Sequence, residues 1–376
     1  MIRSNKSVRR IVALAGVAAL SLTAACGSSD DGDKSSSGGK SDLCGKNIAF
    51  LGALTGDAGA LGQNMVNGIE LALKEYNDKN ADCKINLKKF DSQGSPDTAP
   101  GLATQIVNDD SIFGLVGPGF SGESLATGKT FFEAGLPSIS PSATNVTITQ
   151  QGWSTWHRVI GNDDAQGKAD AKYLTTTAGA KKVFVIDDGQ DYSKGLAGTV
   201  KTALGSALAD SDQISVGQTD MSAAVTKVKA SGADAVFYGG YYTEAGLLAK
   251  ALRQGGFKGT FMSGDGSEDP NFVKVAGAAA AEGAVLSAPA GPAPSGFGAT
   301  GLYATQAYDA TNIFLAAVKD GKSSAKDIND FIGSFTGDGV SGPVAFDDKG
   351  DIKESKIYAY FVKGGKLDVD NPTAME

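Results

Sequence analysis

The sequence predicts an α/β protein with two doubly wound parallel-sheet lobes joined by a three-strand hinge. Short apolar runs alternate with helix-like segments along most of the chain, a pattern typical of βαβ units and parallel sheets. The runs are continuous rather than alternating, as expected of strands covered on both faces. About 330 residues follow the N-terminal region, more than one hydrophobic core usually serves, so two lobes are expected.

The N-terminal region has the features of an export signal, which is predicted over residues 1–25. Four Lys and Arg residues lie within the first ten positions, and the uncharged apolar run after them is too short for a permanent membrane span. The run ends in LTAAC, which resembles the processing site of bacterial lipoproteins and predicts lipidation of Cys26. A polar, flexible tether is expected over residues 26–44. The alternative is an ordinary secretory signal whose cysteine is accidental.

Composition excludes several classes of function. The chain has 34 Lys and Arg against 42 Asp and Glu, with no basic cluster in the part expected to fold, so nucleic acid is not an expected partner. The single histidine, His157, and the lack of a cysteine cluster argue against a metal site. His157 is also the sole imidazole base for a Ser-His-Asp hydrolase, and a structural role is favoured for it.

The elements of the first lobe follow from hydrophobic periodicity. A helix is predicted over 65–76, because Met65, Ile69, Leu73 and Tyr76 recur at helical spacing. The alternation of strands and helices breaks after residue 140, where a polar stretch runs to Gly152 and an apolar segment, 153–160, follows. Strands are predicted at 48–51, 85–90, 112–116 and 138–140.

A second set of βα units follows this break. A Pro/Gly-rich stretch at 288–298 interrupts the set, and another β-like run lies at 342–346. Three crossings between lobes would account for this order: we expect the first lobe over 45–159 plus 290–345, and the second over 160–289 plus 346–376. Such lobes can close about a hinge. The strands are predicted at 183–186, 235–238, 259–262 and 284–286, and the helices at 165–176, 195–208, 224–230, 244–254 and 303–318.

Two cysteines, Cys44 and Cys83, each precede a strand-like run. In a parallel sheet these two strand starts would be neighbours at the same edge, and disulfides persist outside the cytoplasm. The sequence therefore predicts a Cys44–Cys83 disulfide, with two free buried thiols as the alternative.

Residues 117–122 (GPGFSG) match the G-x-G-x-x-G pattern of dinucleotide-binding turns. That function also needs an acidic residue near the end of the next strand, and the segment 137–144 has none. No cofactor is therefore expected. The pattern indicates instead a turn that presents backbone N–H groups and the Ser121 hydroxyl at a helix N-terminus, which suits an anion such as a carboxylate.

Polar and aromatic side chains follow three predicted strands of the second lobe. Tyr192, Tyr241 and Asp265 each come after a strand, and ligands of open α/β sheets bind at the carboxyl ends of strands. These side chains should converge on one wall of a cleft, opposite Ser121 and residues 142–144 of the first lobe. Hydroxyls and amides on one wall suit a carboxylate, and Asp265 on the other suits an ammonium, so a zwitterion would leave no buried charge unpaired.

The chain resembles the branched-chain amino-acid-binding protein family, which has the type I periplasmic-binding fold of ABC importers. The resemblance covers nearly all of residues 45–363 and depends on the order and spacing of many short motifs. These include GALTG at 52–56, GIELA at 68–72, SPSAT at 140–144, RVIGND at 158–163, DYSKG at 191–195 and FYGGY at 237–241.

The resemblance implies a role for each binding residue. Ser121 would bind the ligand carboxylate, and Ser142 and Thr144, with Ala143 between them, would give a backbone carbonyl and a hydroxyl to the zwitterion. Tyr192 and Tyr241 would close over the ligand. Asp265 stands where the family has a glutamate that pairs with the ammonium. Two departures change the apolar part of the pocket: Leu61, expected in the loop after the first strand, replaces an aromatic residue, and Phe120 replaces a small residue or cysteine.

The family implies an extracytoplasmic binding protein without catalysis, which captures a branched-chain or other apolar amino acid and delivers it to an ABC permease. We expect a monomer held at the outer face of the cytoplasmic membrane by lipidated Cys26. One alternative is the same fold binding an amide, urea or aromatic acid. A surface hydrolase or a sensor domain is a further alternative from a different class.

Overall fold

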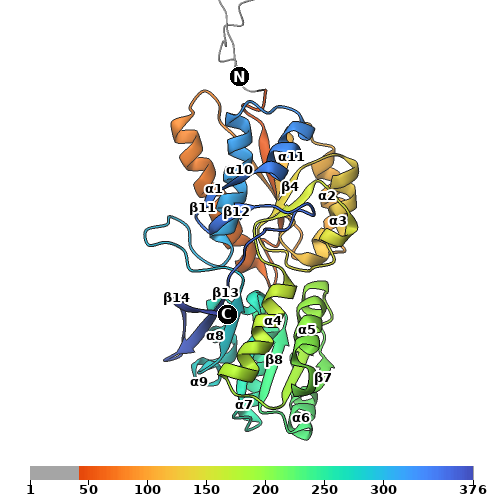
Figure 1. Ribbon diagram of the computed structural model, residues 1–376, viewed down its shortest axis with the longest axis vertical. Coiled ribbons are helices and arrows are strands. Elements are labelled where there is room, and N and C mark those ends of the chain that lie inside the picture. The colour runs from red at the N-terminus through yellow and green to blue at the C-terminus, as the bar shows by residue number, and fades with distance from the viewer. Residues whose placement is uncertain (1–41, 376) are drawn as a thin grey trace, which may run out of the picture. The chain divides into compact units, whose positions relative to one another are not determined.

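A computed structural model of the chain describes residues 42–375 (Figure 1). The predicted export signal, the predicted lipidation site Cys26 and most of the predicted tether lie outside the described residues. Within 42–375, none of the helices combines the length and the apolar composition that crossing a membrane requires.

The first lobe is built on a sheet with the strand order β2-β1-β3-β4-β5, in which all neighbouring strands pair in parallel. Helices flank this sheet, and α1 packs against α10, which returns from far along the chain (Figure 1). The strands are β1 (Asn47–Gly52), β2 (Asn86–Asp91), β3 (Ile112–Val116), β4 (Ser138–Ser140) and β5 (Trp156–Arg158). The helices are α1 (Gly59–Lys79), α2 (Ala99–Val107), α3 (Ser121–Glu133), α10 (Ala304–Lys319) and α11 (Ala325–Ser334), followed by a hairpin of β11 (Thr336–Gly339) and β12 (Gly342–Ala345).

The second lobe is built on a sheet with the order β14-β13-β10-β9-β8-β6-β7, parallel from β10 to β7 and antiparallel at β13 and β14. The strands are β6 (Val183–Asp187), β7 (Leu208–Gln213), β8 (Ala235–Gly239), β9 (Thr260–Ser263), β10 (Val285–Ala288), β13 (Ile357–Lys363) and β14 (Lys366–Met375). The helices are α4 (Asp163–Lys172), α5 (Asp191–Leu204), α6 (Ser222–Ser231), α7 (Tyr242–Gln254), α8 (Pro270–Ala276) and α9 (Ala278–Ala281).

The parallel parts of the two sheets repeat one topology. The order β2-β1-β3-β4-β5 in the first lobe corresponds to β7-β6-β8-β9-β10 in the second. In each, the chain runs from an inner strand to the edge and then returns to the other side of that inner strand. This reversal creates a switch point at the carboxyl ends of the strands, where open α/β sheets bind ligands. The predicted fold class is confirmed.

Both faces of the inner parallel strands are buried. In β1, Ile48 and Phe50 belong to one hydrophobic cluster, while Ala49 and Leu51 belong to another on the opposite face. Residues of β6 and β8 alternate between two clusters in the same way. Continuous apolar runs are therefore the correct signal for these strands, because a strand covered by helices on both sides has no solvent face.

Helix α1 begins six residues earlier than the predicted start at Met65, so Leu61 lies in its first turns and not in a loop. Gly62 allows this start, because a Cβ atom there would lie 1.6 Å from the carbonyl oxygen of Ala53. The missing side chain lets the first turns of the helix pack directly on the segment after β1. This contact has no periodic signal in the sequence.

Other differences lie at sheet edges. The helix predicted over 195–208 ends at Leu204, where Gly205 adopts a φ of +51°, and Leu208–Gln213 form the edge strand β7. This strand has the polar sequence LADSDQ, so it lacks the apolar run that predicts a strand. The antiparallel hairpin of β13 and β14 was likewise not predicted, and the run 342–346 pairs with β11 rather than with a parallel sheet.

Within the described residues, the chain crosses between the lobes three times. Residues 159–162 join β5 to α4, residues 289–303 join β10 to α10, and residues 346–356 join β12 to β13. The third crossing lies against the end of β5, directly before the first crossing, because the backbone N–H of Arg158 donates to the carbonyl of Gly350 at 2.9 Å.

A disulfide joins Cys44 to Cys83, as predicted. The two residues come before β1 and β2, which pair in parallel from Asn47 and Asn86 onward, so their starts are neighbours. The bond joins residues 39 positions apart and closes a loop that contains β1 and α1.

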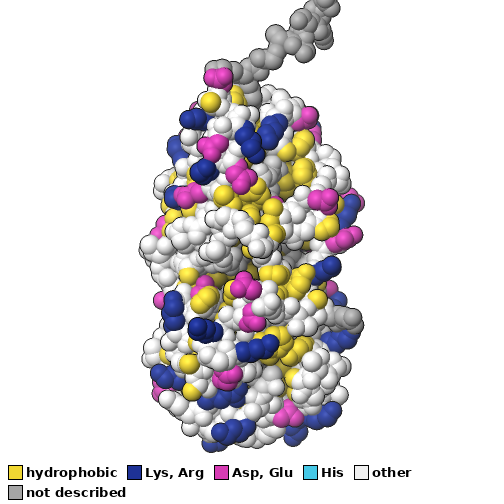
Figure 2. All heavy atoms as spheres, turned by 90° about the vertical axis from the view of Figure 1, so that its left-hand side faces the viewer, with side chains coloured by type: hydrophobic (Ala, Val, Ile, Leu, Met, Phe, Trp, Pro, Cys, Tyr) yellow, Lys and Arg dark blue, Asp and Glu magenta, His cyan; other side chains and the backbone are white. Residues whose placement is uncertain are grey.

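Charged side chains of both signs are interspersed on the face that Figure 2 shows. On this face, the Lys and Arg side chains form no continuous patch in either lobe.

Candidate functional site

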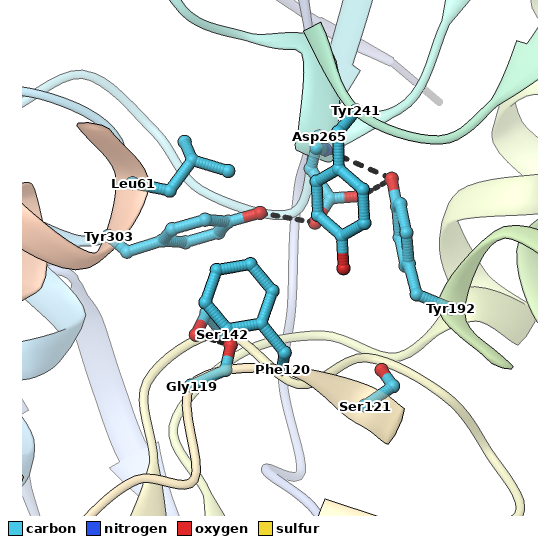
Figure 3. Close-up of a pocket in the computed structure, with 10 residues that line it drawn as sticks. Leu61, Gly119, Phe120, Ser121, Ser142, Tyr192, Tyr241, Asp265 and Tyr303 are labelled. Atoms are coloured by element: carbon cyan, nitrogen blue, oxygen red, sulfur yellow. Dashed lines mark hydrogen bonds between the residues drawn. The ribbon is translucent and has the colours of Figure 1, made fainter. Parts of the chain in front are cut away.

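The candidate site is a cavity between the carboxyl ends of the strands of both lobes (Figure 3). About 230 Å³ of it is free of atoms, a volume that includes space open to solvent. Segments after β1, β3 and β4 line it from the first lobe, and segments after β6, β8 and β9 line it from the second. The lining residues are Leu61, Gly119, Phe120, Ser121, Ser142, Tyr192, Tyr241, Asp265, Gly266 and Tyr303.

The structure brings most of the residues predicted for the site to this cavity. Ala143 and Thr144 are the exceptions, since both are buried and neither lines the cavity. The Thr144 hydroxyl faces the carboxyl of Asp163. Burial raises the pKa of Asp163 to about 8, and the facing Thr144 hydroxyl opposes that shift.

The first-lobe wall presents hydroxyls and a helix N-terminus. Ser121 is the first residue of α3, and its side-chain oxygen accepts a hydrogen bond from the Asn145 amide at 3.2 Å. Ser142 donates its hydroxyl to the carbonyl of Gly119 at 2.6 Å. The partial positive charge of the α3 N-terminus and the free N–H groups of its first turn suit an anion at Ser121.

The second-lobe wall is centred on the buried carboxylate of Asp265, which is 1% exposed. Tyr192 donates its hydroxyl to one oxygen at 2.7 Å, and Tyr303 donates to the other at 2.5 Å (Figure 3). The amide of Gly266 donates to the Tyr192 hydroxyl at 2.9 Å. Burial raises the pKa of Asp265, while the hydrogen bonds from Tyr303, Tyr192 and Gln166 oppose that shift. The hydroxyls thus help to hold a negative charge in a buried place.

Tyr303 is a site residue that the sequence analysis missed. It was counted as part of the helix predicted over 303–318, but it stands just before α10 with a φ of +71° and points into the cavity (Figure 3). The one available signal was its position directly after a Gly-rich stretch. The segment that holds it is the second crossing, so Tyr303 links this crossing to Asp265.

Arg158 supports the loop that carries Ser142. Its guanidinium is fully buried and donates to the carbonyls of Ala143 and Asn145 at 2.9 and 3.0 Å. The same side chain forms an ion pair with Asp351 of the third crossing. Asn145 in turn donates its side-chain amide to the carbonyl of Asp191 in the second lobe at 2.6 Å. One buried cation therefore connects a hinge segment, the Ser142 loop and a contact between the lobes.

Glu123 lies fully buried beneath the turn that carries Phe120 and Ser121. Its carboxyl accepts a hydrogen bond from the Phe120 amide at 3.2 Å and contacts the hydroxyl of Ser92. Burial raises the pKa of Glu123 to about 8, and the hydrogen bonds from Ser92 and the backbone only partly oppose this shift. At neutral pH the group is therefore mostly protonated and does not repel an anion at Ser121.

This raised pKa predicts a pH dependence of stability. Between the ordinary value of 4.5 and about 8, the folded state holds a proton on Glu123 that the unfolded state releases. The Glu123 contribution to stability is complete below pH 4.5 and is lost as the pH rises through 8, by about 1.4 kcal/mol per pH unit between those two values. Chemical denaturation of the wild type and Glu123→Gln at pH 6, 7, 8 and 9 checks this, since the glutamine variant should lose stability less steeply. Equal slopes in the two proteins would contradict it.

The single histidine takes no part in the cavity. His157 is buried and packs edge-on against Phe346, with ring centroids 5.0 Å apart. Burial lowers the pKa of His157 to about 4, so the ring is neutral at pH 7. Across residues 42–375, the His, Cys, Asp and Glu side chains form no group placed to hold a metal ion.

Comparison with known proteins gives consistent similarities over nearly the whole described chain. Residues 46–366 match the family described as periplasmic binding protein. A leucine-specific-binding protein of Salmonella typhimurium is 30% identical over 325 residues, which are 81% of this chain and 88% of the relative. The Leu/Ile/Val-binding protein BraC3 of Rhizobium johnstonii is 29% identical over 342 residues, 85% of this chain and 92% of the relative.

Solved structures show the same similarity. The leucine-binding protein of Thermotoga maritima superimposes with a TM-score of 0.79 at 25% identity and covers 87% of this chain and 98% of its own. The branched-chain amino acid transporter substrate binding protein of Streptococcus pneumoniae, solved in complex with isoleucine, has a TM-score of 0.79 at 26% identity. That match covers 88% of this chain and 99% of the neighbour.

Proposed function

Because this chain belongs to the periplasmic binding protein family, we propose that it captures an amino acid between its two lobes and delivers it to an ABC importer. Relatives named for leucine or for leucine, isoleucine and valine support this assignment. In this proposal the protein performs no chemistry on its ligand, and the residues that contact the ligand only bind it.

One observation carries the proposal: the opposition of Ser121 and Asp265 across a single buried cavity. The helix N-terminus at Ser121 receives the ligand carboxylate, and Asp265 receives its ammonium. A ligand with a single charge would leave the polar groups of the other wall without a partner, and this costs free energy in a buried site. A zwitterion satisfies both walls at once.

The rest of the lining favours an apolar ligand side chain. Leu61 and Phe120 from the first lobe and the ring of Tyr241 from the second supply apolar surface to the cavity. A branched-chain or other apolar amino acid fits this surface. An amide, urea or aromatic acid in the same fold would not use the charge of Asp265.

The proposal places the protein outside the cytoplasm, anchored through lipidated Cys26, with the following residues up to Cys44 as a tether. It acts as a monomer whose lobes span 45–159 plus 290–345 and 160–289 plus 346–376. Membrane attachment brings the loaded protein close to its permease.

A thermal-shift screen tests the function directly. The purified protein is heated with each of the twenty amino acids and with small amides, urea and aromatic acids. A true ligand raises the melting temperature in a concentration-dependent way. We expect apolar amino acids to give the largest shifts. Stabilisation by an uncharged amide or an aromatic acid, and by no amino acid, would overturn the proposal.

A further inference from the structure

Three aromatic side chains, Phe120, Tyr192 and Tyr241, stand between two hollows of the interlobe cleft. The inner hollow is the candidate binding cavity of about 230 Å³. The outer hollow, of about 680 Å³, is lined by glycines of both lobes and by the exposed Lys194. All three aromatic residues line both hollows. We call this group the aromatic partition.

The partition is completed where the two lobes meet. Phe120 comes from the turn after β3 in the first lobe, whereas Tyr192 and Tyr241 come from the second. The ring centroids of Phe120 and Tyr241 are 5.6 Å apart, and those of Tyr241 and Tyr192 are 5.2 Å apart. The three rings therefore form a continuous contact across the cleft, and Figure 3 shows Phe120 and Tyr241 facing each other across the cavity.

Phe120 is the member of the partition whose side chain has no polar atom. Tyr192 bonds to Asp265 and Gly266, so its removal would disturb the charged wall as well as the partition. The Phe120 ring is 5% exposed and contributes packing alone. The outer hollow lies on the far side of the Phe120 ring. It has room there because Gly94, Gly122 and Gly189, which line this hollow, have no side chains.

We infer that Phe120 is a specificity-determining residue that limits the length of the ligand side chain. With Phe120 against Tyr241, the two rings separate the inner hollow from the space lined by Gly94, Gly122 and Gly189, so a long side chain cannot extend into that space. We therefore expect a short apolar side chain such as that of valine to be accepted and an aromatic side chain to be excluded. The inference rests on the proposed function and adds to it the size class of the ligand.

Phe120→Ala joins the two hollows, and calorimetric titration with valine and with phenylalanine measures the effect. We expect the affinity of the variant for phenylalanine to rise at least about tenfold over the wild type. The reason is that the part of the ligand ring that clashes with Phe120, which corresponds to one or more methylene groups, gains space in the variant. The affinity for valine should fall or stay unchanged, since valine gains no contact. Phe120→Leu removes less of the ring and should give a smaller change in the same direction.

The control is Phe132→Ala, which removes a ring from the exposed side of the same helix and should leave both affinities unchanged. Melting curves without ligand identify a variant that fails to fold, in which case the leucine variant decides. If wild type binds amino acids but phenylalanine gains no more than valine in the variants, the inference is overturned and the proposed function stands. If the wild type binds no amino acid, both are overturned.

Discussion

Replacement of Asp265 by alanine is expected to weaken amino acid binding by at least about 2 kcal/mol, which is roughly a thirtyfold rise in Kd. The substitution leaves the ligand ammonium without a counter-charge in a buried cavity. It also removes the acceptor of the Tyr192 and Tyr303 hydroxyls. Isothermal titration calorimetry with the ligand found in the thermal screen measures the change.

Two companion variants separate charge from shape. Asp265→Asn keeps the size of the side chain but cannot pair with the ammonium, so it should lose most of the same affinity. Ser121→Ala should also weaken binding by about 2 kcal/mol, because it removes a buried hydroxyl from the carboxylate side. Asp97→Asn, at an exposed carboxylate of the first lobe, serves as the control. Unchanged affinity in both Asp265→Ala and Ser121→Ala would eliminate this site assignment.

Replacement of Arg158 by methionine is expected to reduce the free energy of unfolding by about 3–5 kcal/mol. Arg158 is fully buried, and without it Asp351 loses its counter-charge and keeps only the hydrogen bond from the Thr149 hydroxyl, while the carbonyls of Ala143 and Asn145 each lose a donor. Chemical denaturation at pH 7 measures this loss. Ligand affinity should fall as well, because the loop that holds Ser142 loses its support.

A double-mutant cycle with Asp351→Asn tests the ion pair itself. If the two residues act together, removing both should cost clearly less than the sum of the single changes. Lys168→Met is the matched control, since Lys168 pairs with Asp164 on the surface and such pairs contribute little. An Arg158→Met protein as stable as the control would show that the buried pair does not hold the hinge.

Much of the architecture was predictable because parallel strands carry a strong local signal. The runs that became β1, β3, β6 and β8 are buried on both faces, so nearly every residue in them is apolar. The edge strand β7 carries no such signal, because its outer face meets water and its composition is that of a loop. The same reasoning applies to β14 at the opposite edge of the sheet, which has no buried residue and a sequence rich in polar residues. It does not apply to β13, whose apolar and mostly buried sequence IYAYFVK was a strand signal that the sequence analysis missed.

The candidate site was predictable in part for a related reason. Tyr192, Tyr241 and Asp265 follow consecutive strands of one sheet, and topology alone brings the carboxyl ends of such strands together. Tyr303 could not be found in this way, because it follows no strand and reaches the cavity from the end of a crossing segment. Thr144 was expected at the ligand, yet its hydroxyl faces Asp163, a side-chain direction that strand position does not determine.

The sequence by itself determined the two-lobe α/β fold, the cysteine pair and the wall to which most of the candidate site residues belong, because these depend on periodicity and on strand order. The tertiary structure alone decided that Tyr303 and Tyr192 share the carboxylate of Asp265 and that Phe120 meets Tyr241. These contacts join residues 38, 73 and 121 positions apart. Hydrogen bonds and ring contacts act over a few ångströms, so their partners are set by how the lobes and crossings pack and not by the neighbouring sequence.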